Sequence, residues 1–297
     1  MNKKGTIFVN IIKIIRPHQW VKNILVFIPL LMSHNFELNI FITTSYAFII
    51  FSLVASSIYV INDIVDLKAD QNHPYKKYRP LAAGLLNINQ CKYLIVTLLF
   101  ICFFLLSKVN KYFLILILSY FVISNLYTFI FKKYPIIDLI ILASLYTMRI
   151  LAGGLIAGID VSIWLISFSI FFFLSLAAIK RQIEIINTKK LKKKDVKGRG
   201  YTVDDQKIID SIAVSTGYIS ILILVLYINS PQVLNLYSSP NALWFICIIM
   251  LYWISRIILN SSRGRIKDDP IVYAINDKIS YLCLVLILCI IWLGIAI

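Results

Sequence analysis

The sequence has little charge and no long polar segment. Only 15% of its 297 residues are charged, whereas 60% are hydrophobic. A soluble domain normally carries about 25% charged residues, and long apolar segments recur here along the whole chain, so a soluble protein is excluded. We expect an all-α integral membrane protein, with residues 1–297 forming a single polytopic domain.

Histidine and cysteine are scarce, and neither shows the spacing of metal ligands. The chain has three His and five Cys, with no CxxC pair. A zinc site or a disulfide framework is therefore not expected. The cysteines lie in or beside apolar segments, and we interpret them as small apolar residues of helices. A phosphate contact of His73, which stands in a polar loop, is left open.

Nine apolar segments are predicted to span the membrane. The first is short for the ~20 residues that a span needs, so it is either tilted or partly interfacial. Residues 1–17 are interrupted by Lys13 and Arg16, which argues against a signal peptide and favours an amphipathic helix on the membrane surface. The predicted spans are 21–35, 41–67, 91–108, 111–131, 135–157, 162–184, 206–229, 241–261 and 275–296.

The basic residues are predicted to lie on one side of the membrane. All of the 30 Lys and Arg except Lys108, Lys111 and Arg149 fall in five segments: 1–23, 62–92, 132–134, 180–207 and 256–278. The positive-inside rule places these segments in the cytoplasm, at what we take to be a prokaryotic cytoplasmic membrane. This face should attract anionic membrane lipids. Nucleic acid is not expected, because no basic and aromatic module is present.

An acidic motif, "NDIVDLKAD" at 62–70, follows the second predicted span. If the helix continues, Asn62, Asp63, Asp66 and Asp70 share one face. Like charges at this spacing repel, and a helix C-terminus disfavours anions. A divalent cation would relieve both penalties, and carboxylate and amide oxygens are hard ligands suited to Mg²⁺. All four residues are therefore predicted to bind metal, with a solvated acidic turn as the alternative.

A basic stretch, "HPYKKYRP" at 73–80, comes directly after the motif. Carboxylates for a metal and cations for phosphate oxygens together make a diphosphate site. We therefore predict that Lys77 and Arg79 contact the phosphates of a substrate. A pure cation channel would not need them.

The motif "NDIVDLKAD" resembles the NDxxDxxxD motif of the UbiA-type intramembrane prenyltransferase superfamily. The resemblance implies nine transmembrane helices around a central cavity open to the cytoplasmic side, with Mg²⁺ and a diphosphate bound at this motif. Most members move a prenyl group from a prenyl diphosphate to an aromatic acceptor. They carry a second motif, commonly DxxxD, after the sixth span.

The second motif is poorly matched in this chain. Residues 180–210 are mostly basic, and their later aspartates lack the DxxxD spacing. Lys180, Arg181 and Glu184 end an apolar span instead, and a cationic site there suits a second anionic substrate. A positive-inside loop is the alternative for the basic stretch that follows. Tyr201 is a candidate to close over the donor.

Four further stretches resemble the decaprenyl-phosphate phosphoribosyltransferase branch: "RPHQWVKNILVFIPLL" (16–31), "HPYKKYRPLAAG" (73–84), "MRILAGG" (148–154) and "DDPIVYAINDK" (268–278). The resemblance implies Mg²⁺-dependent transfer of 5-phosphoribose from 5-phosphoribosyl 1-diphosphate to a polyprenyl phosphate. Prenyl transfer to an aromatic acceptor is the alternative. A transporter is a third hypothesis, but no internal repeat is evident. Chain length of the lipid and oligomeric state, a homo-oligomer included, stay open.

Arg149 is predicted to be an anion ligand, because a charge inside a span costs ~2.5 kcal/mol or more. An internal salt bridge with Asp138 or Glu184 is the alternative. Lys22 and Asn23 follow Trp20 and either bind phosphate or anchor the interface. The catalytic residues expected are Asp63, Asp66, Asp70 and Arg149, with Asp66 the most central. The expected substrate-binding residues are Lys22, Asn23, Asn62, Lys77, Arg79, Lys180, Arg181, Glu184 and Tyr201.

Overall fold

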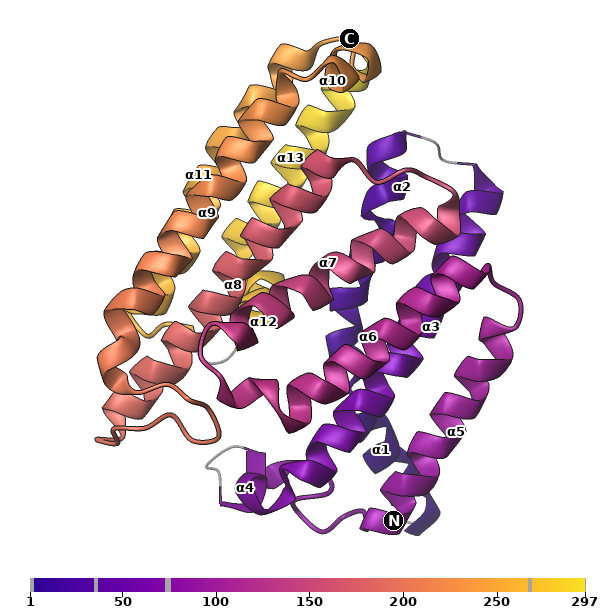
Figure 1. Ribbon diagram of the computed structural model, residues 1–297, viewed down its shortest axis with the longest axis vertical. Helices are drawn as coiled ribbons and strands as arrows, with labels where there is room; N and C mark the ends of the chain where they lie inside the picture. Colours follow the sequence, from indigo (N-terminus) through magenta and orange to yellow (C-terminus); the bar gives the residue numbers. More distant parts are fainter. Residues whose placement is uncertain (1–2, 35–36, 73–75, 267–268, 297) are drawn as a thin grey trace. The chain divides into compact units, whose positions relative to one another are not determined.

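The computed structural model of the chain consists of helices (Figure 1). It describes residues 3–34, 37–72, 76–266 and 269–296. Within these ranges β-structure is limited to one isolated bridge between Asp195 and Thr202. Eight helices in the same ranges are long and apolar enough to cross a membrane. The predicted all-α membrane fold is confirmed, and the chain is a multi-pass membrane protein.

The long helices begin and end close to their predicted limits. Asn87, Asn110 and Ser162 cap three of them at the N-terminus, each accepting a hydrogen bond from a backbone N–H of the first turn. The helices are α3 (Leu38–Val65), α5 (Ile88–Leu106), α6 (Lys111–Phe129), α7 (Ile137–Ala157), α8 (Ile163–Lys190), α9 (Gln206–Ile228), α11 (Trp244–Ser262) and α13 (Lys278–Ala296).

The first predicted span, 21–35, does not form one long helix. Its described part belongs to a 3-10 helix, η1 (Pro17–Phe27), and a six-residue helix, α2 (Ile28–Ser33). Lys22 and Asn23 of η1 are buried, because this segment packs against α3 instead of facing lipid along its length. The predicted count of nine spanning helices is therefore not confirmed in the part of the chain that the structure describes.

Shorter elements connect the long helices. They are α1 (Lys3–Ile15), α4 (Leu67–Gln71), η2 (Lys76–Tyr78), η3 (Phe131–Lys133), η4 (Val203–Asp205), α10 (Pro231–Leu236), η5 (Pro240–Leu243) and α12 (Pro270–Asn276).

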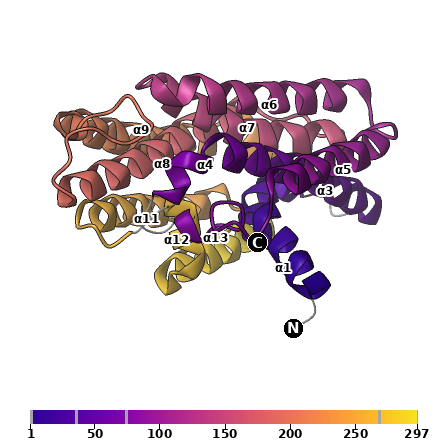
Figure 2. The same cartoon turned by 90° about the horizontal axis from the view of Figure 1, so that it is seen from below.

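The contacts divide the chain into two compact units. Unit 1 comprises 1–130 and 148–161, and unit 2 comprises 131–147 and 162–297, so the boundary falls inside α7. In unit 1, α3 packs against α5, α6 and η1. In unit 2, α8 and α9 run side by side, and α11 packs against α9 and α13 (Figures 1 and 2). The expectation of a single domain over 1–297 stays a prediction.

Helix α1 has the two faces that its sequence predicts. Ile14 is buried in a cluster with Val60 and Leu81, whereas Phe8 and Ile12 are exposed. The helix lies at the edge of its unit (Figure 2). An exposed apolar face on a basic helix suits the surface of a membrane, and that placement stays a prediction.

Gly153 of α7 touches the backbone of η1. A Cβ atom at this position would overlap the carbonyl oxygen of Val26 and lie 3.2 Å from Cδ of Pro29. A change of rotamer cannot relieve the overlap, because the obstructing atom belongs to the backbone. The glycine therefore has the packing role expected for small residues in membrane helices.

We predict that Gly153→Ala destabilises the protein by about 1–3 kcal/mol or more, the usual cost of overpacking. The measurement is thermal unfolding of the purified chain in detergent. Gly294→Ala is the matched control, since its Cβ meets the Tyr237 ring at 3.2 Å and alanine favours a helix by about 1 kcal/mol. Equal melting temperatures for the two variants would contradict the close approach at Gly153.

Candidate functional site

The acidic motif lies at the junction of α3 and α4. Helix α3 ends at Val65, and Asp66 has φ −91° and ψ 7° before α4 begins. The Asp66 N–H still donates to the Asn62 carbonyl at 2.9 Å, and the Asp70 N–H to the Asp66 carbonyl at 2.8 Å. The predicted continuous helix over 62–70 is thus interrupted at Asp66, although the helical spacing of the acidic residues is retained.

Two of the four motif residues are buried and paired with arginines. Asp63 and Asp70 are 3% and 4% exposed. Nη1 of Arg79 lies 2.5 Å from Oδ2 of Asp70 and 3.2 Å from Oδ1 of Asp63. Arg16 pairs with the same Oδ1 of Asp63. The arginines therefore offset the repulsion between buried carboxylates that the sequence implied, while Asn62 and Asp66 stay partly exposed.

Arg79 is directed towards the acids by the turn that follows it. Leu81 and Leu86 are buried in the cluster formed with Ile14 and Val60. The backbone N–H of Leu86 donates to the Pro80 carbonyl at 3.2 Å, which closes the turn. Lys77 is exposed, with its amine 5.1 Å from the centroid of the Tyr78 ring. His73 lies outside the described residues.

The segment before α2 runs antiparallel along one face of α3. Asn23 donates to Oγ of Ser52 at 3.1 Å, and Trp20 donates to Oγ of Ser56 at 3.0 Å. Arg16, earlier in the chain, reaches Asp63 further along α3. Sequence reasoning missed Arg16 as a site residue. The available signal was the helical spacing of polar side chains within an apolar span: Ser52, Ser56, Tyr59 and Asp63.

Arg149 is buried in unit 1 and is 5% exposed. Its Nε donates to Oδ1 of Asn23 at 2.9 Å, and its Nη2 donates to the Tyr120 hydroxyl at 2.7 Å. The guanidinium carbon also lies 5.0 Å from the centroid of the Tyr120 ring. Lys22, which precedes Asn23, is buried too. Asn23 and Tyr120 thus help to orient the guanidinium, and Tyr120 is a residue that the sequence did not single out.

Asp138 and Glu184, the carboxylates considered as partners of Arg149, both pair with Arg181 in unit 2. Arg181 and Asp138 are fully buried, and Nε of the arginine lies 2.6 Å from Oδ2 of the aspartate. Arg181 also pairs with Glu184 one turn later. Arg199 lies 3.7 Å from the same glutamate. Arg181 is therefore engaged by two acids, and a contact with substrate stays a prediction.

Tyr201 is buried at 2% exposure and belongs to the same cluster. Its hydroxyl donates to Oδ1 of Asp138 at 2.6 Å and accepts from the backbone N–H of Ile136 at 2.8 Å. Burial, together with the hydrogen bond to Asp138, raises the pKa of Tyr201 well above its ordinary value. The tyrosine thus anchors the basic loop between α8 and α9. The predicted closure over a donor is not tested.

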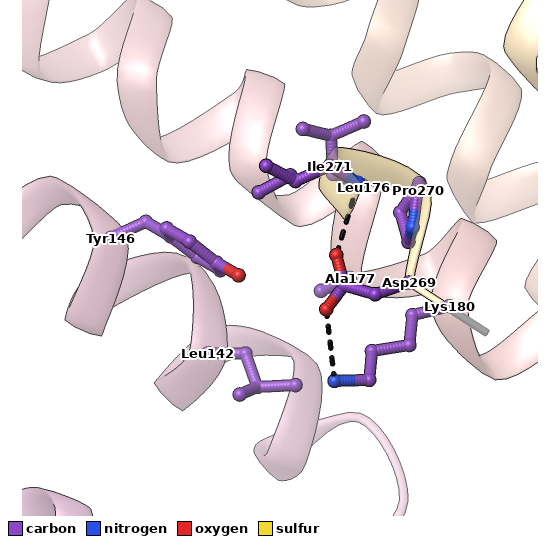
Figure 3. A pocket seen from close by; sticks show the side chains of 8 residues that line it. All are labelled: Leu142, Tyr146, Leu176, Ala177, Lys180, Asp269, Pro270 and Ile271. Atoms are coloured by element: carbon purple, nitrogen blue, oxygen red, sulfur yellow. Dashed lines mark hydrogen bonds and ion pairs between the residues drawn. The ribbon is translucent and has the colours of Figure 1, made fainter. Parts of the chain in front are cut away.

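Lys180 lines a small pocket between α7, α8 and α12 (Figure 3). Its amine lies 3.4 Å from Oδ2 of Asp269. The other oxygen of this carboxylate, Oδ1, caps α12 by accepting from the N–H of Ile271 at 3.0 Å. Beyond the other end of α12, Asp277 accepts two hydrogen bonds from Arg256 at 2.7 and 2.9 Å. These bonds hold the pKa of Asp277 at about 2. Ion pairs therefore fix both ends of α12.

The acidic motif fits a single Mg²⁺ ion. The described ranges contain no group of three or more His, Cys, Asp or Glu that could hold a metal. However, Oδ2 of Asp63 is buried and has no hydrogen-bond partner in those ranges. Mg²⁺ usually takes one or two carboxylates and completes its shell with water and substrate phosphates. Asp63, with Asp66 or Asp70, would suffice for that mode of binding.

The model of the UbiA prenyltransferase family matches residues 24–268. The chain belongs to this family. Its fold is similar to that of a UbiA homolog from Archaeoglobus fulgidus bound to DMAPP and Mg²⁺, with a TM-score of 0.70. That match covers 95% of this chain and 99% of the other at 15% identity, so it concerns the fold alone.

Three relatives of this UbiA-family chain differ in how much of it they match. Nodulation protein NoeC of Azorhizobium caulinodans is 34% identical over 276 residues, 91% of this chain and 88% of the relative. The uncharacterized protein y4nM of Sinorhizobium fredii is 33% identical over 90% of this chain and 52% of its own length. The decaprenyl-phosphate phosphoribosyltransferase of Corynebacterium glutamicum is 36% identical over 180 residues, 59% of this chain and 54% of that enzyme. The chain thus spans about half the length of the last two, and the predicted resemblance to the phosphoribosyltransferase branch is confirmed over part of the chain.

We predict that Arg181→Leu destabilises unit 2 by about 3–5 kcal/mol, because it leaves the buried Asp138 without its partner. Thermal unfolding in detergent measures the loss. The double variant Arg181→Leu/Asp138→Leu should recover at least half of it, since no buried charge is then left alone. If the two changes were additive, the pairing would not be the source of the stability.

Proposed function

We propose that the protein transfers 5-phosphoribose from 5-phosphoribosyl 1-diphosphate to a polyprenyl phosphate and releases diphosphate. The observation that carries the proposal is the neutralisation of Asp138 and Glu184 by Arg181. Both carboxylate oxygens of Asp138 are engaged, Oδ2 by Arg181 and Oδ1 by the Tyr201 hydroxyl. This acid is therefore poorly disposed to hold a second metal–diphosphate group, unlike Asp63, whose Oδ2 has no hydrogen-bond partner in the described residues. The carboxylates of unit 1 then serve one diphosphate substrate, and the second substrate binds through cations.

The donor site is assigned to the acidic motif and the turn after it. Asn62, Asp63, Asp66 and Asp70 would hold Mg²⁺ and the ribosyl diphosphate. The ion, when bound, neutralises charge that develops on the leaving diphosphate. Arg79 sits beside both buried aspartates, so it can contact diphosphate oxygens at the same place, and the exposed Lys77 adds a mobile cation. In this assignment the motif faces the cytoplasm.

The acceptor phosphate is assigned to Arg149. Charged residues inside a span commonly mark a binding site, Arg149 is buried in unit 1, and a polyprenyl phosphate brings an anion on an apolar chain. Asn23 and Tyr120 hold the guanidinium through its Nε and Nη2. Lys22, next to Asn23 in η1, would add a second cation.

The reaction needs orientation more than it needs a base. An oxygen of the lipid phosphate forms the new bond to the anomeric carbon of ribose, while the bond from that carbon to the diphosphate oxygen breaks. The nucleophile is already an anion, so no proton has to be removed. The transition state should resemble an oxocarbenium ion, and catalysis then rests on holding two polyanions in line.

The residues at the end of α8 have different roles in this proposal. Lys180 is partly exposed and lines a pocket, so it is assigned to substrate phosphate. Arg181, Glu184 and Tyr201 are held in the buried cluster around Asp138. In this proposal these three residues position the polar end of α8 and do not themselves contact the substrate.

Prenyl transfer to an aromatic acceptor is the second candidate. It is favoured by the family itself and by the fold shared with a homolog that binds DMAPP and Mg²⁺. The names of the two relatives matched over about 90% of the chain state no reaction. The two candidates place the lipid differently, as the acceptor in the first and as the donor in the second.

Incubation of the purified chain with radiolabelled 5-phosphoribosyl 1-diphosphate, Mg²⁺ and decaprenyl or undecaprenyl phosphate should move the label into the lipid phase. A parallel reaction with a prenyl diphosphate and an aromatic acid should give no product. Absence of lipid-phase label together with turnover of the prenyl diphosphate would replace the first candidate by the second.

Asp66→Ala should lower Mg²⁺-dependent transfer by at least about 10²-fold, because a group that stabilises charge in the transition state is removed. Asp66 is partly exposed, so the melting temperature should stay close to that of the wild type. Asp160→Ala removes an exposed carboxylate outside the motif and should retain full activity. Near-normal turnover of Asp66→Ala would rule out the assigned role of this aspartate.

A further inference from the structure

Arg16 has a backbone conformation that residues other than glycine rarely adopt. Its φ and ψ are 54° and 63°, in the left-handed region, and Pro17 follows it. This region is unfavourable for residues other than glycine, and a following proline restricts the preceding residue further. Such a conformation persists only where the surroundings impose it, and it is often found at functional sites.

Hydrogen bonds on both sides of Arg16 hold its backbone in this left-handed conformation. On one side, Oγ of Ser56 donates to the carbonyl of Ile15 at 2.9 Å. On the other side, the indole of Trp20 donates to the same hydroxyl at 3.0 Å. The chain is therefore attached to α3 both before and after Arg16. Its guanidinium lies 5.4 Å from the centroid of the Tyr59 ring and pairs with Asp63, one turn beyond that tyrosine.

The two oxygens of Asp63 have different surroundings. Oδ1 is paired with Arg16 and with Arg79. Oδ2 is buried and has no hydrogen-bond partner in the described part of the chain. Arg79 is shared with Asp70, to which it is closer, at 2.5 Å against 3.2 Å. Within the described residues, Arg16 forms its ion pair with Asp63 alone.

We propose that Arg16 is a positioning residue that holds Oδ1 of Asp63 and thereby presents Oδ2 to the divalent cation. Partners of this kind orient metal ligands and raise metal affinity, and their loss typically costs 10–100-fold in affinity. The inference rests on the proposed metal–diphosphate role of the acidic motif. It does not depend on whether the transferred group is ribosyl or prenyl.

The test measures the binding of Mn²⁺, as the probe metal, to the full chain in detergent with inorganic diphosphate present. Free Mn²⁺ is read from its electron paramagnetic resonance signal. Arg16→Gly is the main variant, because glycine adopts positive φ readily and the backbone should keep its course. We expect its Mn²⁺ dissociation constant to rise by about 10–100-fold. Lys13→Ala removes an exposed cation from the neighbouring helix α1 and should stay within about twofold of the wild type on the same scale.

Two further measurements separate positioning from a merely structural role. Arg16→Lys, or methylguanidinium added to Arg16→Gly, should restore part of the Mn²⁺ affinity. Arg16→Gly should still unfold cooperatively without metal, with only a modest fall in melting temperature, because Arg79 still pairs with Asp63 and glycine accepts the positive φ. Unchanged Mn²⁺ affinity in Arg16→Gly would overturn the proposal. So would a loss that no cation restores, or wild-type affinity in Asp63→Asn.

The assay contains neither a ribosyl donor nor a polyprenyl lipid. Failure of phosphoribosyl transfer would therefore leave this inference standing, and failure of the Mn²⁺ test would leave the transfer assay unaffected.

Discussion

The burial of charged side chains in a mostly apolar chain is the constraint on which both candidate sites depend. Each buried acid needs a cation, because an uncompensated charge away from water is costly. In unit 1, Arg16 and Arg79 serve the two buried aspartates of the motif. In unit 2, Arg181 serves Asp138 and Glu184. The arrangement of helix ends and loops follows from where these pairs have to meet.

The clusters around Asp63 and around Arg181 differ in whether their charged groups can still bind a ligand. Around Asp63, one carboxylate oxygen is left without a hydrogen-bond partner in the described residues, and the pairing arginine Arg79 is 28% exposed in its side chain. Around Arg181, the guanidinium and Asp138 are both fully buried. The first cluster can exchange partners with a ligand, and the second is organised as a fixed support. This contrast separates a candidate binding site in unit 1 from a structural cluster in unit 2.

Much of the fold follows from local sequence, because apolar length and cap residues act within one helix. The spans from α3 to α13 were predictable for this reason, and the acidic motif was recognisable from spacing alone. The family also followed from motifs, and its model matches residues 24–268. The segment 21–35 could not be predicted in detail, because the same apolar residues form a 3-10 helix packed on α3 and a short α-helix in its described part.

The roles of individual charges were less predictable than the helices. Arg16 and Asp63 are separated by 47 residues, and Arg181 and Asp138 by 43. The hydrophobic periodicity of one segment cannot predict contacts between residues so far apart in the sequence. Arg149 was identified because a charged side chain inside a membrane span is energetically costly. Its partners Asn23 and Tyr120 could not be identified in the same way, because they come from other elements. The sequence singled out Asp66 as the most central acid of the motif, but the structure shows that Asp63 is the more deeply buried of the two.

The pairing of Asp138 with Arg181 has a consequence for biosynthesis. The chain is made from its N-terminus, so Asp138 leaves the ribosome 43 residues before its partner. Until Arg181 has been synthesised, the acid must stay hydrated. The start of α7 can therefore reach its final packing only after Arg181 has been synthesised, so this ion pair forms late in the assembly of unit 2.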